Sequence, residues 1–344
     1  MSTENLLQDF EGVTPYQSDD EVEGIAFNTG DTLLANIRPY LKKAWYAAFD
    51  GTCSADVLAF SPKRISPAFL YNIIARDCFI EYVMSGVKGS KMPRGDKTHI
   101  LEYEFAIPEK DEQEKIATFI ALADCKIAKQ RKMIAALKKY KRGVTAKLIT
   151  AIEEKYPVVK LGNYVAVMRG GSPRPIDAYI TNAENGIRWI KIGDAQPDQL
   201  YISDTKEKIK PEGAKKSRRV YAGDLILSNS MSFGRPYILK VDGCIHDGWL
   251  LIRDEGKKFD KRFLCFYLAS DATLAQYKKY AAGSCVNNLN SELVASVEIG
   301  MPPIEQQIRV ANILEKIDRQ VEAASTMYSL LSKLRSFLLQ QLFI

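Results

Sequence analysis

The sequence of 344 residues predicts an α+β protein made of two copies of one module, each a mixed α/β domain followed by a long helix. Two observations carry this prediction. A proline-to-glutamine stretch that begins a helical pattern occurs twice, and the residues before each occurrence resemble each other. The length agrees with two modules, because the chain has more residues than one ordinary hydrophobic core supports and enough for two domains of about 100–150 residues.

The composition is that of a folded protein, with 46% hydrophobic and 10% aromatic residues. No apolar stretch approaches the length of a membrane span, and the polar start "MSTENLLQDFEG" lacks a signal-peptide core, so we expect a cytoplasmic protein without a membrane partner. The net charge of +6 permits a nucleic-acid partner without requiring one. We expect reduced thiols and no metal site, because no CxxC spacing occurs among Cys53, Cys78, Cys125, Cys244, Cys265 and Cys285.

The doubled helix start is the clearest repeat. "IPEKDEQEKIATFIALADCKI" begins at Ile107 and "MPPIEQQIRVANILEKIDRQV" begins at Met301. A shift of 194 positions places Pro108 on Pro302 and Gln113 on Gln307, and the match runs without a gap to the last residue. The pattern predicts two long helices, over residues 108–155 and 302–344.

Apolar residues in both predicted helices are spaced alternately four and three apart, which is typical of a coiled-coil seam. Lys141 and Arg335 fall in the same seam position of the two copies, where a charge can fix the register. A whole domain separates the helices, so we predict that they pair as an antiparallel coiled coil; two unrelated amphipathic helices are the simpler alternative. The predicted seam residues are Ile116, Ile120, Ile127, Ile134, Leu137, Val144, Leu148, Val310, Leu314, Ile317, Val321, Tyr328, Leu331, Leu338 and Leu342.

The repeat extends into the two predicted domains, residues 1–107 and 156–301. "GDTLLANIRP" from Gly30 matches "GDLILSNSMS" from Gly223, and "CSADVLAF" from Cys53 matches "CIHDGWLL" from Cys244. The stretch of the second copy from residue 157 to residue 194 has no counterpart in the first. We therefore expect the first domain to lack its initial segment.

These features resemble the DNA-specificity subunit of a type I restriction-modification system. The resemblance rests on the two proline-to-helix starts, the Gly-Asp pair before an apolar strand in each half, and the stretch "LGNYVAVMRGGSPRP" followed by "GIRWIKIGD". It implies two target-recognition domains, each reading one half of a split site in double-stranded DNA, and two helices that separate them. It also implies that two adenine-methyltransferase subunits dock on the chain and that motor-nuclease subunits join for cleavage.

No motif for chemistry is recognisable. "GGSPRP" from Gly170 lacks the Gly-Lys-Ser/Thr ending of a P-loop, and "RDEGKK" around Asp254 is typical of a polar turn. His99 and His246 are single and distant in sequence, so no nucleophile relay is visible. We predict no catalytic residue and no cofactor, and a chain that is not an enzyme by itself.

DNA reading requires cations for phosphates and polar side chains for base edges. Asn and Arg can make paired hydrogen bonds to bases, so they are the favoured base contacts, and lysines are assigned to the backbone. The candidates in the first domain are Asn36, Arg38, Tyr40, Lys42, Lys43, Lys88, Lys91 and Arg94. In the second domain they are Arg169, Ser172, Arg174, Lys215, Lys216, Arg218, Arg219, Ser228, Asn229, Ser230 and Arg235.

Two other functions stay open at this point. The chain could be a coiled-coil scaffold whose domains bind proteins, or an enzyme with a site that the sequence does not reveal. Between Lys126 and Lys147 the first helix carries nine cations and no acid, which suits a solvated face, DNA or an acidic partner. Binding to duplex DNA that depends on sequence and falls steeply with salt separates DNA recognition from a scaffold.

Overall fold

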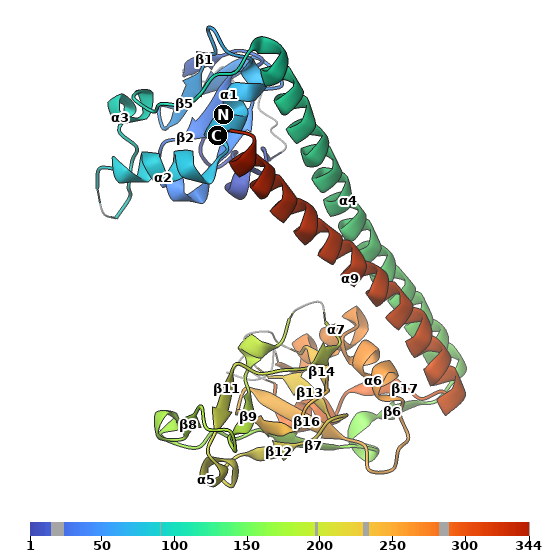
Figure 1. Ribbon diagram of the computed structural model, residues 1–344. Coiled ribbons are helices and arrows are strands. Elements are labelled where there is room, and N and C mark those ends of the chain that lie inside the picture. The colour runs from blue at the N-terminus through green and yellow to red at the C-terminus, as the bar shows by residue number, and fades with distance from the viewer. Residues whose placement is uncertain (15–23, 90, 197–198, 230–233, 282–288, 344) are drawn as a thin grey trace. The chain divides into compact units, whose positions relative to one another are not determined.

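The computed structural model describes residues 1–344 apart from 15–23, 90, 197–198, 230–233, 282–288 and 344. The chain divides into a first unit, Met1–Arg131 with Met327–Ile344, and a second unit, Lys132–Thr326. The division cuts both long helices, α4 (Lys110–Lys155) and α9 (Ile304–Gln341), so each unit holds one domain and a stretch of each helix (Figure 1). None of the helices in the described ranges has the length and apolar character of a membrane span.

The first unit holds the short elements β1 (Ile25–Phe27), β2 (Thr32–Ala35), β3 (Ala44–Tyr46), β4 (Gly51–Cys53), β5 (Val57–Phe60), α1 (Pro67–Ile74), α2 (Asp77–Ser85) and α3 (Lys97–Leu101). Its main sheet has the antiparallel order β3-β2-β5, and β1 pairs with β4. Side chains alternate across a strand. Leu34 therefore joins the cluster with Ile80 and Val83 of α2, whereas Leu33 joins the cluster with Phe27 of β1.

The second unit holds the strands β6 (Val158–Lys160), β7 (Ala166–Arg169), β8 (Ile180–Thr181), β9 (Ile187–Ile190), β10 (Tyr201–Ile202), β11 (Glu207–Ile209), β12 (Arg218–Val220), β13 (Leu225–Ser228), β14 (Pro236–Leu239), β15 (Gly243–Ile245), β16 (Trp249–Arg253) and β17 (Glu298–Gly300). Its short helices are α5 (Pro211–Ala214), α6 (Lys261–Leu268), α7 (Asp271–Ala281) and α8 (Ser291–Ala295). Two five-stranded sheets have the orders β10-β14-β13-β16-β7 and β12-β15-β9-β11-β8, and β17 pairs with β6. The predicted mixed α+β class is confirmed.

The two domains share an element order. The order β3-β2-β5 of the first unit matches β14-β13-β16 of the second, and the pair β1-β4 matches β12-β15. The helices α1, α2 and α3 begin at Pro67, Asp77 and Lys97, each 194 positions before the start of α6, α7 and α8. Strands β6 to β9 come from the part of the second domain, residues 157–194, for which the sequence offers no counterpart.

The repeated Gly-Asp pair forms the same turn in both domains. Gly30 and Gly223 have φ angles of 91° and 88°, a conformation that favours glycine. The carboxylate of Asp31 accepts a hydrogen bond from the backbone of Asn28 at 2.8 Å, and that of Asp224 accepts one from Tyr221 at 2.9 Å. Each turn leads directly into the buried central strand.

The predicted seam positions lie on the covered faces of α4 and α9, where every one of them is buried or half-buried. In the first unit, Ile116 of α4 shares a hydrophobic cluster with Leu342, beyond the end of α9. In the second unit, Leu148 of α4 packs against the cluster that contains Val310 and Leu314 of α9. These clusters also include domain residues, so each helix stretch is packed against its own domain.

A buried glutamine ties each long helix to its domain. Gln113 accepts a hydrogen bond from the backbone N–H of Ser66 and donates one to the carbonyl of Pro108, both at 2.8 Å. Gln307 accepts one from Asp260 at 2.9 Å and donates to Pro302 at 2.9 Å and to Lys258 at 3.1 Å. The exposed fractions of the two glutamines are 4% and 1%, so water cannot replace these partners.

We expect Gln307→Ala to lower the free energy of unfolding by about 1–3 kcal/mol, because it leaves a buried N–H and two carbonyl groups with fewer partners. Urea unfolding followed by circular dichroism measures the effect. Gln320→Ala is the matched control, since Gln320 is an exposed glutamine of the same helix. Equal unfolding midpoints for the two variants would contradict the stabilising role of Gln307.

Candidate nucleic-acid interface

In the first unit, the candidate residues meet where β2 ends. The backbone N–H of Arg38 donates to the carbonyl of Pro93 at 2.8 Å, and that of Gly95 donates to the carbonyl of Asn36 at 3.1 Å. These bonds place the turn after β2 against the segment that follows α2. The candidates with exposed side chains on this surface are Arg38, Tyr40, Lys88, Lys91 and Arg94.

Carboxylates hold several of these cations. The Arg94 guanidinium lies 3.1 Å from the Asp56 carboxylate. Lys88 forms an ion pair with Asp96, and the hydrogen bond between them is the main cause that lowers the pKa of the Asp96 carboxyl. Two further candidates, Lys42 and Lys43, are half-buried and bonded to other residues of the domain. Lys42 pairs with Asp77 at 2.7 Å, which raises the lysine pKa, and the Lys43 ammonium donates to the carbonyl of Thr3 at 2.7 Å.

In the second unit, four candidates converge on Asp247. Ser172 donates to the Asp247 carboxylate at 2.8 Å, and Arg174 lies 3.6 Å from it. Arg169 and Asn229 donate to the Asp247 carbonyl at 3.3 Å and 2.8 Å. The hydrogen bond from Ser172 is the main cause that lowers the pKa of the Asp247 carboxyl, so this anchor is negatively charged at neutral pH.

Glycine is required where the segment after β7 passes His246. A side-chain carbon on Gly170 would lie 2.1 Å from the His246 carbonyl oxygen. The backbone N–H groups of Gly170 and Gly171 donate to Trp249 at 2.8 Å and to Ile245 at 3.1 Å. The stretch "GGSPRP", which is not a P-loop, is thus a backbone-anchored loop that presents Ser172 and Arg174.

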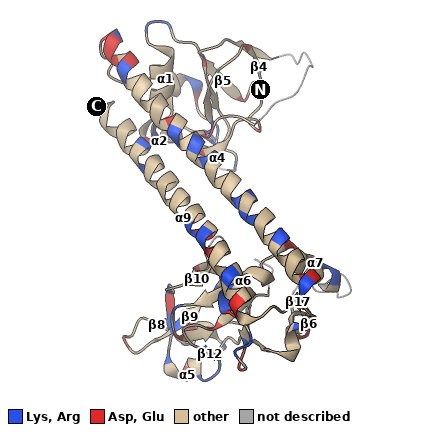
Figure 2. Cartoon of the chain, turned by 90° about the vertical axis from the view of Figure 1, so that its right-hand side faces the viewer, with Lys and Arg blue, Asp and Glu red and all other residues tan. Residues whose placement is uncertain are grey.

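The basic stretch before and within β12 adjoins this loop. Arg218 donates to the carbonyl of Arg169 at 3.1 Å, which links the two predicted groups of cations. Lys216 donates to the Tyr179 hydroxyl at 2.6 Å and lies 5.0 Å from the centre of its ring. The side chains of Lys215, Arg218 and Arg219 are exposed. Figure 2 marks the Lys and Arg residues of the chain in blue.

The structure does not support base contact by three predicted residues. Asn36, Ser228 and Asn229 have exposed fractions of 9%, 0% and 3%, so their side chains cannot reach a base edge in this conformation. Ser228 accepts a hydrogen bond from the backbone of Arg235 at 2.9 Å, and Asn229 bonds to Asp247; both stabilise the end of β13. The Arg235 side chain is exposed, and Ser230 lies outside the described residues.

The histidines and the acidic turn have structural contacts. His99 stacks on Tyr82 with ring centres 4.1 Å apart, and burial lowers the pKa of His246. The Asp254 carboxylate accepts a hydrogen bond from the backbone of Phe259 at 2.7 Å, as expected of a polar turn. Across the described ranges, no three His, Cys, Asp or Glu side chains come together in a way that could hold a metal ion.

The sequence analysis missed the two aspartates that organise these surfaces. Asp56 pairs with Arg94, and Asp247 pairs with Arg174. The two carboxylates occupy the same position of the repeated stretches "CSADVLAF" and "CIHDGWLL". The shared acid is a signal in the sequence, but residue type alone does not assign an aspartate to a cationic surface.

Comparison with known proteins agrees with the resemblance seen in the sequence. A sequence profile described as Type I restriction modification DNA specificity domain matches residues 14–139 and 153–327. The specificity subunit assigned to the MjaX type I restriction enzyme of Methanocaldococcus jannaschii is 26% identical over 244 residues. The MjaVIII specificity subunit of the same organism is 24% identical over 276 residues.

The aligned parts cover 66% and 73% of this chain and 55% and 63% of these two relatives, so the chain spans less than two thirds of their length. The type I restriction-modification S subunit from M. genitalium is a solved structure with a TM-score of 0.61 and 14% identity. A chain from a structure of type I R-M complex assembly has a TM-score of 0.57 and 19% identity. Each alignment covers 94% of this chain and 84% of the other, and likeness at such identities shows the fold alone.

The profile covers most of the sequence in two blocks, of which the first contains most of the first domain and the second contains all of the second domain. The protein belongs to the family of type I restriction modification DNA specificity domains.

Proposed function

We propose that this protein is the sequence-specific DNA recognition subunit of a type I restriction-modification complex and has no catalytic activity of its own. The observation that carries the proposal is the pair of cationic surfaces, one in each unit, in which Asp56 and Asp247 hold arginines beside exposed lysines and arginines. Each surface supplies cations for phosphates and arginines for base edges. Two such surfaces suit a site read in two halves.

The proposed modules are target-recognition domains over residues 1–107 and 156–301, with helical segments over 108–155 and 302–344 between and after them. Support for a repeat comes from the shared strand order and the constant separation of their helices. We propose that the protein acts in the cytoplasm, as expected of a subunit that reads cellular DNA. We propose that the shorter first domain also reads DNA, and its exposed Arg38, Lys91 and Arg94 support that role.

We infer that α4 and α9 form an antiparallel coiled coil that spaces the two domains. In the first unit, Arg335 of α9 bonds to Asp124 of α4; in the second unit, Lys141 of α4 bonds to Asp318 of α9. Lys141 and Arg335 are repeat equivalents, as are Asp124 and Asp318. From Asp124 to Lys141 the residue numbers along α4 rise, whereas those of the partners in α9 fall from Arg335 to Asp318. This order supports antiparallel pairing.

Docking of two methyltransferase subunits and of motor-nuclease subunits requires a surface for protein partners. Such a surface is offered by Met327, Leu330, Leu334 and Phe337 of α9, which are spaced three, four and three apart. Their exposed fractions are 50%, 56%, 49% and 56%, which is high for large apolar side chains on one helix face. The same stripe would suit a coiled-coil scaffold, so DNA binding decides between the two functions.

Binding of the full chain, assembled with its methyltransferase subunits, to duplex DNA tests the proposed function. We expect affinity that depends on both halves of a split sequence and that falls steeply between about 50 and 200 mM salt. Sequencing of methylated adenines in cells carrying the gene identifies the duplex to use. An affinity for DNA that depended on neither the sequence nor the salt concentration would favour the alternative function, a coiled-coil scaffold that binds proteins.

We expect Asp247→Ala to weaken specific binding about tenfold, because a hydrogen bond worth roughly 1–1.5 kcal/mol no longer holds Ser172 in place. Binding to unrelated duplex should stay equal or become tighter, since a negative charge is removed from a cationic surface. Fluorescence anisotropy with both duplexes measures the two affinities. Asp177→Ala is the control for charge, because Asp177 is an exposed acid outside this cluster; equal loss in both variants would contradict the anchoring role.

The inferred register can be tested by exchanging charges. We expect Lys141→Asp to destabilise the protein, because two carboxylates would face each other in a half-buried seam. Adding Asp318→Lys should restore much of the stability by recreating the pair in reverse. Thermal unfolding of both single variants and the double variant measures the coupling; additive losses would show that the two side chains do not depend on each other.

A further inference from the structure

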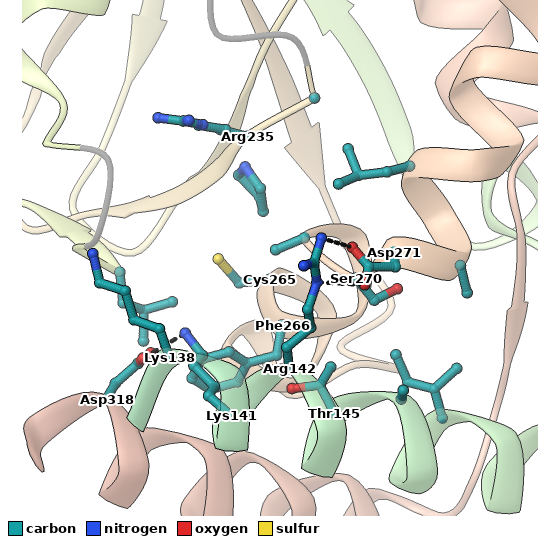
Figure 3. Close-up of a pocket in the computed structure, with 18 of the residues that line it drawn as sticks. Lys138, Lys141, Arg142, Thr145, Arg235, Cys265, Phe266, Ser270, Asp271 and Asp318 are labelled. Atoms are coloured by element: carbon teal, nitrogen blue, oxygen red, sulfur yellow. Dashed lines mark hydrogen bonds and ion pairs between the residues drawn. The ribbon is translucent and has the colours of Figure 1, made fainter. Parts of the chain in front are cut away.

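A cavity in the second unit lies between α4, α6, α7 and α9 (Figure 3). Its lining includes neither Asp247 nor the residues that bond to Asp247. Its volume is about 910 Å³, within the size range of ligand-binding pockets. One wall is the face of α4 that carries Lys138, Lys139 and Arg142. Lys278 of α7 and Arg235, just before β14, line other walls.

Positive charge predominates in the lining of this cavity. Its lining includes six cations, Lys138, Lys139, Lys141, Arg142, Arg235 and Lys278, and three acids, Glu153, Asp271 and Asp318. Each acid has a partner in the protein. Asp271 accepts from Arg142 at 2.7 Å, Asp318 pairs with Lys141, and Glu153 accepts from the Tyr267 hydroxyl at 2.5 Å.

The acids thus neutralise at most a part of the cationic lining. The side chains of Lys139, Arg235 and Lys278 are exposed, and they come from three different elements around one hollow. Cations gathered this way repel one another unless an anion lies between them. An anionic ligand is therefore the chemistry that the cavity favours.

We propose that this cavity binds phosphate groups of the DNA backbone, in addition to the contacts made at the surface around Asp247. The proposal rests on the proposed function and extends it. Two observations favour a nucleic-acid backbone over a free nucleotide. The aromatic residues of the lining, Tyr237 and Phe266, are only 3% and 5% exposed and offer no ring face on which a base could stack.

The second observation is the position of Arg235. Its backbone N–H donates to the Ser228 hydroxyl at the end of β13, and its exposed side chain both lines the cavity and is one of the predicted DNA contacts. Backbone phosphates held in the cavity would lie next to this arginine. The lysines of the cavity would then contribute to affinity without adding sequence preference.

The test compares two double variants of the full chain assembled with its methyltransferase subunits. Lys139→Gln with Lys278→Gln removes one cavity cation from α4 and one from α7. Lys132→Gln with Lys279→Gln removes one exposed cation from each of the same helices, and neither residue lines the cavity. Affinity for cognate and unrelated duplex is measured across a series of salt concentrations.

We expect the cavity variant to lower the slope of log Kd against log salt by about 0.9 for each lost phosphate contact. Both duplexes should be weakened by the same factor, and the control variant should behave as the wild type. A cavity variant with the slope of the control would overturn this inference, although wild-type binding would still uphold the proposed function. Loss of sequence preference in the cavity variant would also overturn it, because phosphate contacts carry none.

Free phosphate compounds distinguish the source of the anion. ATP and inorganic phosphate are titrated against the wild type and both variants by calorimetry. No binding at millimolar concentration supports the DNA backbone as the ligand. ATP binding that required Lys139 and Lys278, with duplex binding unchanged, would identify a nucleotide site and overturn the assignment to DNA.

Discussion

The arrangement of this protein depends on a buried glutamine at the start of each long helix. A polar side chain out of reach of water must have its hydrogen bonds satisfied within the protein. Gln113 and Gln307 do so by bonding to the backbone before α1 and α6 and to the proline before each long helix. Ser66 and Asp260 are the N-cap residues of α1 and α6, and N–H groups at a helix N-terminus have no partner within the helix. Because only one orientation satisfies them all, each long helix has a defined direction relative to its own domain.

The seam of the long helices obeys a related constraint. Apolar side chains alone tolerate a shift of one heptad, because one leucine replaces another at little cost in free energy. Lys141 and Arg335 do not tolerate such a shift, since each would lose its aspartate partner and remain as a poorly hydrated charge. A buried pair of this kind adds little stability compared with apolar residues, but it makes the wrong registers costly. If α4 and α9 act as a spacer, this selectivity matters more than added stability.

Features that depend on local periodicity could be predicted from the sequence, and features that depend on burial could not. The four-three spacing located the covered faces of α4 and α9, because side-chain direction along a helix follows from position alone. Asn36 and Asn229 were misplaced, because residue type shows hydrogen-bonding capacity but not exposure. The cavity beside α4 could not be predicted from the sequence either, because Lys139 and Lys278 are brought to one cavity by the packing of elements that are distant in sequence.

If the cationic surfaces bind DNA as proposed, their carboxylates would allow binding strength and sequence preference to be set separately. An exposed ion pair is weak, so a phosphate can replace the carboxylate beside an arginine at a small cost in free energy. Until then, the carboxylate limits the directions in which the arginine side chain can point, as Asp56 does for Arg94. Cations without such a partner keep their freedom and attract any phosphate. Paired arginines are therefore suited to reading bases, and unpaired lysines to holding the backbone.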